Sequence, residues 1–164
     1  MKKFAKFFMA AMMVATVGFV ACSKDDNKKS DDNPNPSYTE SATFDILHDG
    51  DAIASGDTVF NESFIIHFYV KNLTSENQNA CFKVEYVSGP AAMKMLTSCI
   101  EVCYDPEACP FSKSFTVNAQ GQQELEFKYM EGGVDAGSTA VYRLTVGKGS
   151  ALEDAQVIFF TLKV

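Results

Sequence analysis

The sequence predicts an all-β protein whose one globular domain is an antiparallel β-sandwich. Apolar and polar residues alternate with a period of two in several short runs, and turn-forming residues separate these runs. No stretch of the globular part sustains the 3.6-residue period of an amphipathic helix. Short strands at regular spacing with turns between them are typical of a sandwich.

The strands can be placed in order from this alternation. It is clearest where Phe64, Ile66, Phe68 and Val70 face one way and the residues between them face the other. The later strands are expected at residues 82–86, 115–117, 124–129, 142–146 and 158–164. The turns between them are expected at residues 49–51, 55–57, 72–79, 88–90, 119–121, 131–133 and 147–149. Residues 91–97 and 150–154 are expected to form further turns.

The N-terminal residues are predicted to form an export signal. Lys2, Lys3 and Lys6 precede an apolar run, residues 7–20, of about fourteen residues. That run is shorter than the roughly twenty residues of a membrane-spanning helix, so it fits a secretory signal instead. The signal ends in Phe-Val-Ala followed by Cys22, which resembles a lipobox. This resemblance implies cleavage before Cys22 and lipidation of its thiol, and two or more acyl chains would anchor the protein stably. The alternative is an ordinary secretory signal with an incidental cysteine.

The segment after Cys22 is predicted to be a flexible tether. Residues 22–37 contain no aliphatic or aromatic side chain that could bury apolar surface. Their start, Cys-Ser-Lys-Asp-Asp, resembles the acidic export signal of Bacteroidota surface lipoproteins, which implies anchoring at the outer membrane and exposure on the cell surface. The expected organisation is therefore a signal peptide at 1–21, a lipid-anchored acidic linker at 22–37 and a β-sandwich domain at 38–164.

The net charge restricts the classes of partner. The whole chain has a formal charge of −7, and removal of the signal peptide takes away three lysines and no acid. An acidic surface repels phosphate backbones, so we expect no nucleic-acid partner. The expected partners are the membrane, through the lipid on Cys22, and a protein or a glycan.

Several segments of the globular part, taken in order, resemble a known group of domains. They are Tyr69-Val-Lys-Asn-Leu-Thr74, Cys99-x-x-x-Cys103-Tyr-Asp-Pro106, Phe115-Thr-Val-Asn-Ala119, Phe127-Lys-Tyr129, Gly137-Ser138 and Val141-Tyr-Arg-Leu144. This series resembles small immunoglobulin-like domains of exported Bacteroidota proteins, and the likeness covers roughly residue 58 to the end. The resemblance implies an immunoglobulin-like β-sandwich and gives no activity.

Four cysteines beyond Cys22 predict two disulfides, because the count is even and we expect the chain to be exported. Spacing leaves the pairing open. Cys103 and Cys109 flank a good turn, which would leave Cys81 to pair with Cys99. An extended chain would hold the Cα atoms of Cys99 and Cys103 about 13 Å apart, so their pairing needs a local turn. The family resemblance favours Cys99–Cys103 and leaves Cys81–Cys109.

Sulfur-rich residues 93–109 offer a different interpretation. Met93, Met95, Cys99 and Cys103 together would suit Cu(I) handling, and the cysteines could instead be redox-active. Methionine is also a common core residue, however, and Met93 and Met95 are expected to share a strand face. The paired spacings of a zinc site and a Cys-x-x-Cys motif are both missing from the sequence.

No catalytic motif accompanies the two histidines, His48 and His67. A cluster of acids in residues 49–57 lacks the spacing of a Ca²⁺ loop. The chain has no tryptophan to stack on sugars, and the aromatic side chains that could substitute are Tyr69, Tyr104, Tyr129 and Tyr142. We therefore expect a non-catalytic binding or envelope-assembly module without metal or cofactor, and residues 91–110 are its expected contact surface.

Overall fold

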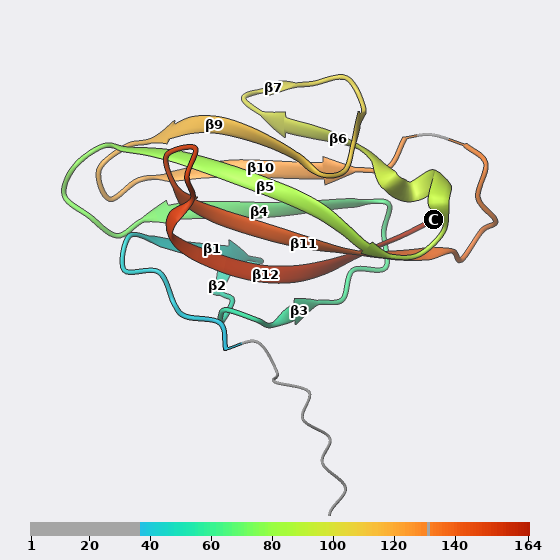
Figure 1. Cartoon of the computed structure of the whole chain (residues 1–164), viewed down its shortest axis with the longest axis horizontal. Coiled ribbons are helices and arrows are strands. Elements are labelled where there is room, and N and C mark those ends of the chain that lie inside the picture. The colour runs from blue at the N-terminus through green and yellow to red at the C-terminus, as the bar shows by residue number, and fades with distance from the viewer. Residues whose placement is uncertain (1–36, 131) are drawn as a thin grey trace, which may run out of the picture. The chain divides into compact units, whose positions relative to one another are not determined.

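The computed structural model describes residues 37–130 and 132–164, which form two β-sheets packed face to face (Figure 1). This confirms the predicted all-β sandwich. The predicted signal peptide, Cys22 and nearly all of the predicted tether lie outside the described residues. Within the described part, no helix is long and apolar enough to cross a bilayer.

The first sheet has the strand order β2–β1–β4–β10–β6–β7, and the short strand β8 also pairs with β6. All of its strand pairs are antiparallel. Its strands are β1 (Phe44–His48), β2 (Asp51–Ala52), β4 (Ile65–Asn72), β6 (Met95–Ile100), β7 (Val102–Cys103), β8 (Glu107–Ala108) and β10 (Gln122–Lys128).

The second sheet has the order β3–β12–β11–β5–β9. Its strands are β3 (Thr58–Val59), β5 (Gln78–Ser88), β9 (Phe111–Val117), β11 (Thr139–Lys148) and β12 (Glu153–Lys163). The strand β3 runs parallel to β12, whereas the other pairs are antiparallel. One margin of this sheet is therefore β9, which pairs with β5 alone.

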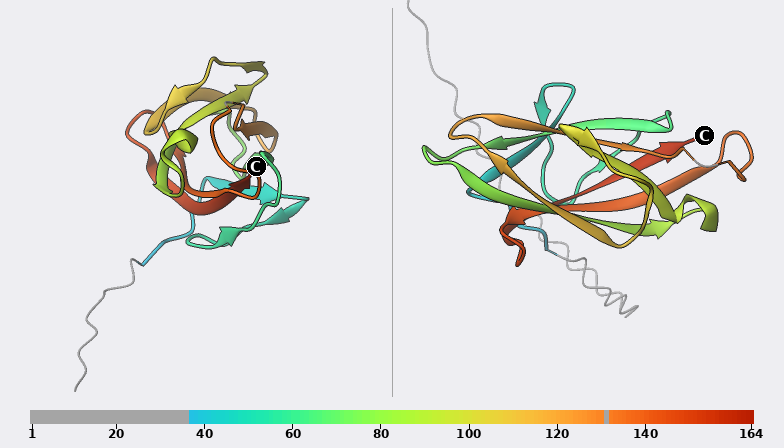
Figure 2. Two further views of the ribbon diagram at one scale, coloured as in Figure 1. Left: turned by 90° about the vertical axis from the view of Figure 1, so that its right-hand side faces the viewer. Right: turned by 90° about the horizontal axis from the view of Figure 1, so that it is seen from above.

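The chain crosses repeatedly between the sheets in its middle third. After β5 it forms a 3₁₀ helix, η1 (Ala91–Lys94), and enters the first sheet as β6. It then returns to the second sheet as β9 and crosses again to β10. Both views in Figure 2 show β6, β7 and β9 close together along one side of the sandwich. Residues from both sheets can consequently contribute to one surface there.

Five aromatic side chains join the two sheets in the core. Phe68 and Phe127 of the first sheet meet Phe160 of the second at ring-centroid distances of 5.4 and 5.5 Å. Phe82 lies 5.3 Å from Phe127, and Tyr142 lies 5.1 Å from Phe160. All five are fully buried, so truncation of Phe160 to alanine should cost about 3–5 kcal/mol.

The alternation predicted the buried face of β4 correctly for Ile66, Phe68 and Val70. Phe64, which was expected on the same face, precedes the strand and is 49% exposed. Met93 and Met95 do not share a strand face. Met93 lies in η1 and is buried in the core, where its carbonyl accepts a hydrogen bond from the Tyr142 hydroxyl at 2.6 Å.

Candidate functional site

A tight turn and a disulfide organise the outer margin of the first sheet. Strand β6 ends at Ile100 and β7 begins at Val102, so Glu101 makes the turn alone and has a φ of 59°. The backbone N–H of Tyr104 donates to the carbonyl of Ser98 at 2.9 Å. The next pair of opposite residues toward the turn therefore exchanges no backbone hydrogen bonds with each other. In an antiparallel ladder, such pairs have the shortest distance between opposite Cα atoms.

Cys99 and Cys103 occupy that pair, with Cα atoms 3.9 Å apart, and the structure joins them by an S–S bond of 2.05 Å. The local turn that this pairing requires is supplied by Glu101. The bond therefore fixes the β6–β7 hairpin at its tip.

The other two cysteines are free thiols, so the expected Cys81–Cys109 bond is not formed. Cys81 lies opposite Ser114 of β9, whereas Cys109 precedes that strand. Ser114 and Cys109 are five positions apart, which corresponds to about 16 Å of extended chain, far beyond disulfide reach. The alternative pairings Cys103–Cys109 and Cys81–Cys99 are also not formed. Burial raises the pKa of the Cys109 thiol to about 11.

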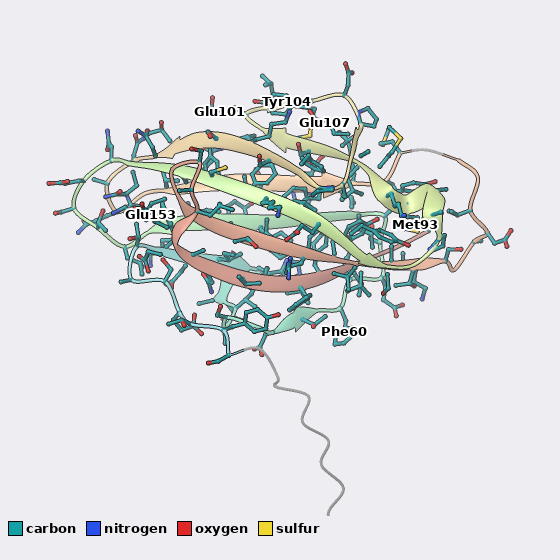
Figure 3. The ribbon with its side chains drawn as sticks, viewed as in Figure 1. Phe60, Met93, Glu101, Tyr104, Glu107 and Glu153 are labelled. Carbon is teal, nitrogen blue, oxygen red and sulfur yellow. A yellow bond between two sulfur atoms is a disulfide. The ribbon has the colours of Figure 1, made fainter. Side chains whose placement is uncertain are left out.

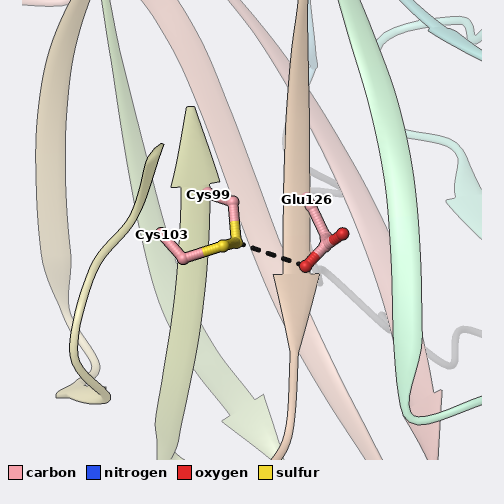
Figure 4. Close-up of side chains that lie close together, drawn as sticks. All are labelled: Cys99, Cys103 and Glu126. Atoms are coloured by element: carbon pink, nitrogen blue, oxygen red, sulfur yellow. Dashed lines mark hydrogen bonds between the residues drawn. A yellow bond between two sulfur atoms is a disulfide. The ribbon is translucent and has the colours of Figure 1, made fainter. Parts of the chain in front are cut away.

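The disulfide begins a row of polar side chains across the outer face of the first sheet. Strand register places Cys99 opposite Cys103 and Glu126, and Glu126 opposite His67, so the row crosses four strands. Glu126 Oε1 lies 3.2 Å from Cys99 Sγ (Figure 4). Because that sulfur carries no proton in the disulfide, the approach is a contact and not a hydrogen bond.

Charged neighbours flank this row on both sides. Lys128 Nζ lies 3.2 Å from Glu126 Oε1 and 4.0 Å from Cys103 Sγ. His67 Nδ1 lies 2.8 Å from Glu124 Oε1, and its Nε2 lies 3.8 Å from Glu126 Oε2. The negative charge of Glu124 raises the pKa of the nearby Tyr69 hydroxyl.

Two adjoining depressions meet at Glu101. The smaller, of about 160 Å³, is lined by Cys99, Glu101, Glu124 and Glu126. The larger, of about 260 Å³, is lined by Ile100, Glu101, Tyr104, Ser114, Phe115, Thr116 and Gln123. We call the two together the Glu101 groove. It runs from the acidic outer face of the first sheet to the free margin of β9.

The segment after β7 ties this groove to β9. Lys113 of β9 forms an ion pair with Glu107 of β8, and its ammonium lies 4.6 Å from the centroid of the Tyr104 ring. Figure 3 shows Glu101, Tyr104 and Glu107 along one side of the sandwich. The groove is thus walled by elements of both sheets that side-chain contacts hold together.

The sulfur ligands proposed for copper are not assembled into a site. Met93 is buried in the core, whereas Cys99 lies on the outer face of β6 and is bonded to Cys103. Met95 is four residues from Cys99 on the same strand, or about 13 Å. Among the described residues, the His, Cys, Asp and Glu side chains within chelating distance form one group, Cys99, Cys103 and Glu126. Because both sulfurs are in the disulfide, Glu126 is the one free ligand of that group.

In the part of the chain that the structure describes, neither histidine contacts a hydroxyl or thiol nucleophile. His48 Nδ1 lies 2.9 Å from the backbone oxygen of His67, and the ring nitrogens of His67 face carboxylates. The acids of residues 49–57 do not converge into a chelating group in the described structure. Tyr129 and Tyr142 are buried, which leaves Tyr69 and Tyr104 as the accessible members of the tyrosine set.

A third, more open depression of about 420 Å³ lies elsewhere on the domain. It is formed by residues 77–79 at the start of β5 and by the β11–β12 turn, and its charged side chains are Lys148 and Glu153. This depression is lined by polar side chains but holds no cluster of titratable groups. We therefore take the Glu101 groove as the candidate site.

The predicted contact surface, residues 91–110, contributes Cys99, Ile100, Glu101 and Tyr104 to the groove. The segment contains three strands, where a loop was expected. Sequence reasoning missed Glu101, Glu124 and the β9 residues. The outward position of Glu124 could have been inferred from the 124–129 alternation. The nearness of β9 could not, because it depends on the crossing between sheets.

No protein-family model and no curated protein sequence matches this chain. Among solved structures, the N-terminal domain of PorA is 17% identical with a TM-score of 0.54, and the match covers 73% of this chain and 96% of that one. The E. coli chaperone DraB is 13% identical with a TM-score of 0.43, covering 73% and 55% of the two chains. Domain 7, an ASH/PapD-like domain, of human CEP192 is 8% identical with a TM-score of 0.38, covering 84% and 94%. At this identity, the likeness to the PorA domain shows a shared β-sandwich fold and nothing of its activity.

Proposed function

We propose that this protein is a non-catalytic binding module of the bacterial cell envelope, anchored by a lipid on Cys22 and exposed at the cell surface. The observation that carries the binding role is the Glu101 groove, where two depressions share one exposed carboxylate. Its partner in this proposal is a protein with a basic segment, because the lining includes three glutamates and no lysine or arginine.

The three glutamates of the groove differ in whether a basic side chain of the domain lies beside them. Glu126 has Lys128 at 3.2 Å, and Glu124 has His67 at 2.8 Å. Glu101 is exposed and forms no ion pair with any residue that the structure describes. A basic side chain of a partner would find its strongest uncompensated attraction at Glu101.

Charge reversal tests this role. The experiment captures proteins from solubilised envelopes at low salt on three baits: the wild-type protein, Glu101→Lys and Glu153→Lys. The last is the control, because Glu153 lines the separate 420 Å³ depression. A partner retained by the wild type and by Glu153→Lys, but lost with Glu101→Lys, is the expected result. Equal capture by all three proteins would refute a binding role for the groove.

The anchoring part of the proposal is tested separately. Wild-type protein should fractionate with membranes and carry acyl mass on its N-terminal cysteine, whereas Cys22→Ser should not be acylated. An unmodified mature N-terminus in the wild type would refute lipid anchoring. It would leave the groove proposal standing.

A second candidate function is thiol–disulfide exchange at Cys99–Cys103. Its supporting observation is that Cys103 is exposed and that the Lys128 ammonium, 4.0 Å from its sulfur, would attract an attacking thiolate. A partner thiolate would attack Cys103 Sγ, and the S–S electron pair would leave on Cys99 Sγ. A second partner thiol would then resolve the mixed disulfide, so the partner dithiol is oxidised and both cysteines end as thiols.

This second candidate is tested by equilibrating the native protein with a series of glutathione redox buffers and counting its thiols. Reduction within the range of known oxidoreductases, roughly −120 to −270 mV, supports exchange. A disulfide that stays oxidised below about −300 mV is structural.

A further inference from the structure

The edge strands of the two sheets differ in length. Three of the four edge strands, β2, β3 and β7, have two residues each. The fourth margin is β9, with seven residues. Short edge strands prevent pairing with other chains, and a long one presents a row of unpaired N–H and C=O groups.

The register shows which β9 groups face outward. The N–H of Gly149 donates to the carbonyl of Asn79 at 2.9 Å, so the backbone of Asn79 points toward β11. Successive strand residues alternate in this direction, and Asn79 lies opposite Thr116 in an unshifted register. The backbone groups of Ser112, Ser114 and Thr116 therefore point away from β5.

The two halves of β9 differ in protection. Lys113 is an inward-pointing charge on an edge strand, and its contacts with Glu107 and Tyr104 cover the first half. Ser114 and Thr116 are exposed and line the Glu101 groove instead. Unpaired backbone groups thus lie beside a depression that has a free carboxylate in its wall.

We propose that the Glu101 groove binds an extended basic polypeptide segment, which adds to the C-terminal half of β9 as a further strand. Backbone bonds to Ser114 and Thr116 provide affinity, and a lysine or arginine of the segment meets Glu101. This inference rests on the proposed binding function and specifies the chemistry of its partner. The acidic lining selects a basic segment over a second copy of this acidic chain.

The test uses a fluorescein-labelled peptide as long as β9 that alternates lysine with valine and threonine. Two derivatives carry N-methyl groups on alternate residues, one set on each edge of the extended peptide. N-methylation removes a backbone donor and keeps every side chain and charge, so it separates strand pairing from charge attraction. Binding to the full-length chain is followed by fluorescence polarisation, and amide exchange of Ser114 and Thr116 is followed by NMR.

The expected result has three parts. The parent peptide binds, Glu101→Lys weakens binding about tenfold or more while Glu153→Lys does not, and one N-methylated derivative is inactive while the other still binds. In addition, the Ser114 and Thr116 amides exchange more slowly in the complex. These amides point into the groove, so no change within the β5–β9 ladder is expected.

Other outcomes overturn the inference in distinguishable ways. Equal binding of both N-methylated derivatives rules out strand addition and leaves an electrostatic groove, so the proposed function survives. Absence of peptide binding together with Glu101-dependent envelope capture means that the partner is not an extended basic segment. Absence of both effects removes the proposed function as well. Concentration-dependent dimerisation that a Thr116→Pro variant abolishes would identify a second copy as the occupant of β9.

Discussion

Asn72 provides the sharpest test of how the margin of the groove is built. This side chain is fully buried at the end of β4. Its Nδ2 donates to the carbonyls of Glu76, Val117 and Asn118 at 2.7, 3.2 and 3.0 Å. Its Oδ1 accepts from the backbone N–H and the hydroxyl of Thr74. One amide therefore joins the β4–β5 loop to the end of β9.

Replacement of Asn72 by Asp changes the chemistry of that amide with almost no change in volume. Two N–H donors are lost, at about 1 kcal/mol each, and a carboxylate oxygen faces three carbonyl oxygens in a buried site. Uncompensated burial of charge brings the total to about 4 kcal/mol at pH 7. This is a large part of the 5–15 kcal/mol by which a domain is ordinarily stable.

The penalty should depend on pH with a defined sign. Burial beside carbonyl oxygens raises the pKa of the introduced carboxyl above its ordinary value of about 3.9. A raised folded-state pKa means that the folded form favours the protonated acid. The penalty is therefore full at neutral pH and shrinks as the pH falls through the folded-state pKa toward about 4.

Urea unfolding of wild type, Asn72→Asp and Asn72→Ala at pH 7 and pH 4.5 measures these effects. Asn72→Ala removes the same hydrogen bonds without adding charge, so we expect a smaller loss of about 2–3 kcal/mol that does not vary with pH. A loss below about 1 kcal/mol for Asn72→Asp at pH 7 would refute the reasoning. A penalty that grows as the pH falls would refute it equally.

Four further predictions concern other parts of the domain. Alkylation of the unreduced, denatured domain should modify two thiols, Cys81 and Cys109, and intact mass should show one disulfide; modification of none would contradict the structure. In the native protein at pH 7 both thiols should react slowly, because Cys81 is buried and burial raises the pKa of Cys109 to about 11. Hydrogen bonds from the Thr43 hydroxyl and the Ala42 N–H lower the pKa of Asp154, so its stabilising effect is present above about pH 4 and is lost at lower pH. Asp154→Asn should accordingly lower the urea midpoint at pH 7 and leave it nearly unchanged at pH 2.5. Tyr142→Phe removes the hydroxyl that bonds the Met93 carbonyl and should cost about 1–2 kcal/mol in urea unfolding, more than Tyr86→Phe, whose hydroxyl bonds the exposed Gly89.

The sandwich could be predicted because burial of one face of each strand imposes a period of two. Ile66, Phe68 and Val70, and likewise Leu125 and Phe127, are buried as their alternation indicates. Alternation does not report which strand is the neighbour of which. The prediction therefore could not show that β9 pairs with β5 while β10 lies in the other sheet.

Disulfide pairing shows the same limit. The count of four cysteines favoured two bonds, yet pairing depends on register and on turns. Glu101 supplies a turn so tight that Cys99 and Cys103 become opposite neighbours. Cys81 and Cys109 lie near the same pair of strands but about 16 Å apart along them. A non-glycine residue with positive φ, such as Glu101, carries no clear sequence signal.

The Cys99–Cys103 disulfide has a part in both candidate functions, and the two functions predict different effects of removing it. A bond closing five residues contributes about 2 kcal/mol by restricting the unfolded chain. The Cys99→Ser/Cys103→Ser variant should keep the Tyr104–Ser98 backbone bond, which brackets the hairpin independently of the sulfurs. Under the binding proposal this variant therefore loses some stability and part of its peptide affinity, because Glu101 is less firmly held. Under the exchange candidate it loses all activity. Partial retention of peptide binding in the serine variant would thus assign the disulfide a supporting role in the groove, whereas a redox role requires the sulfurs themselves.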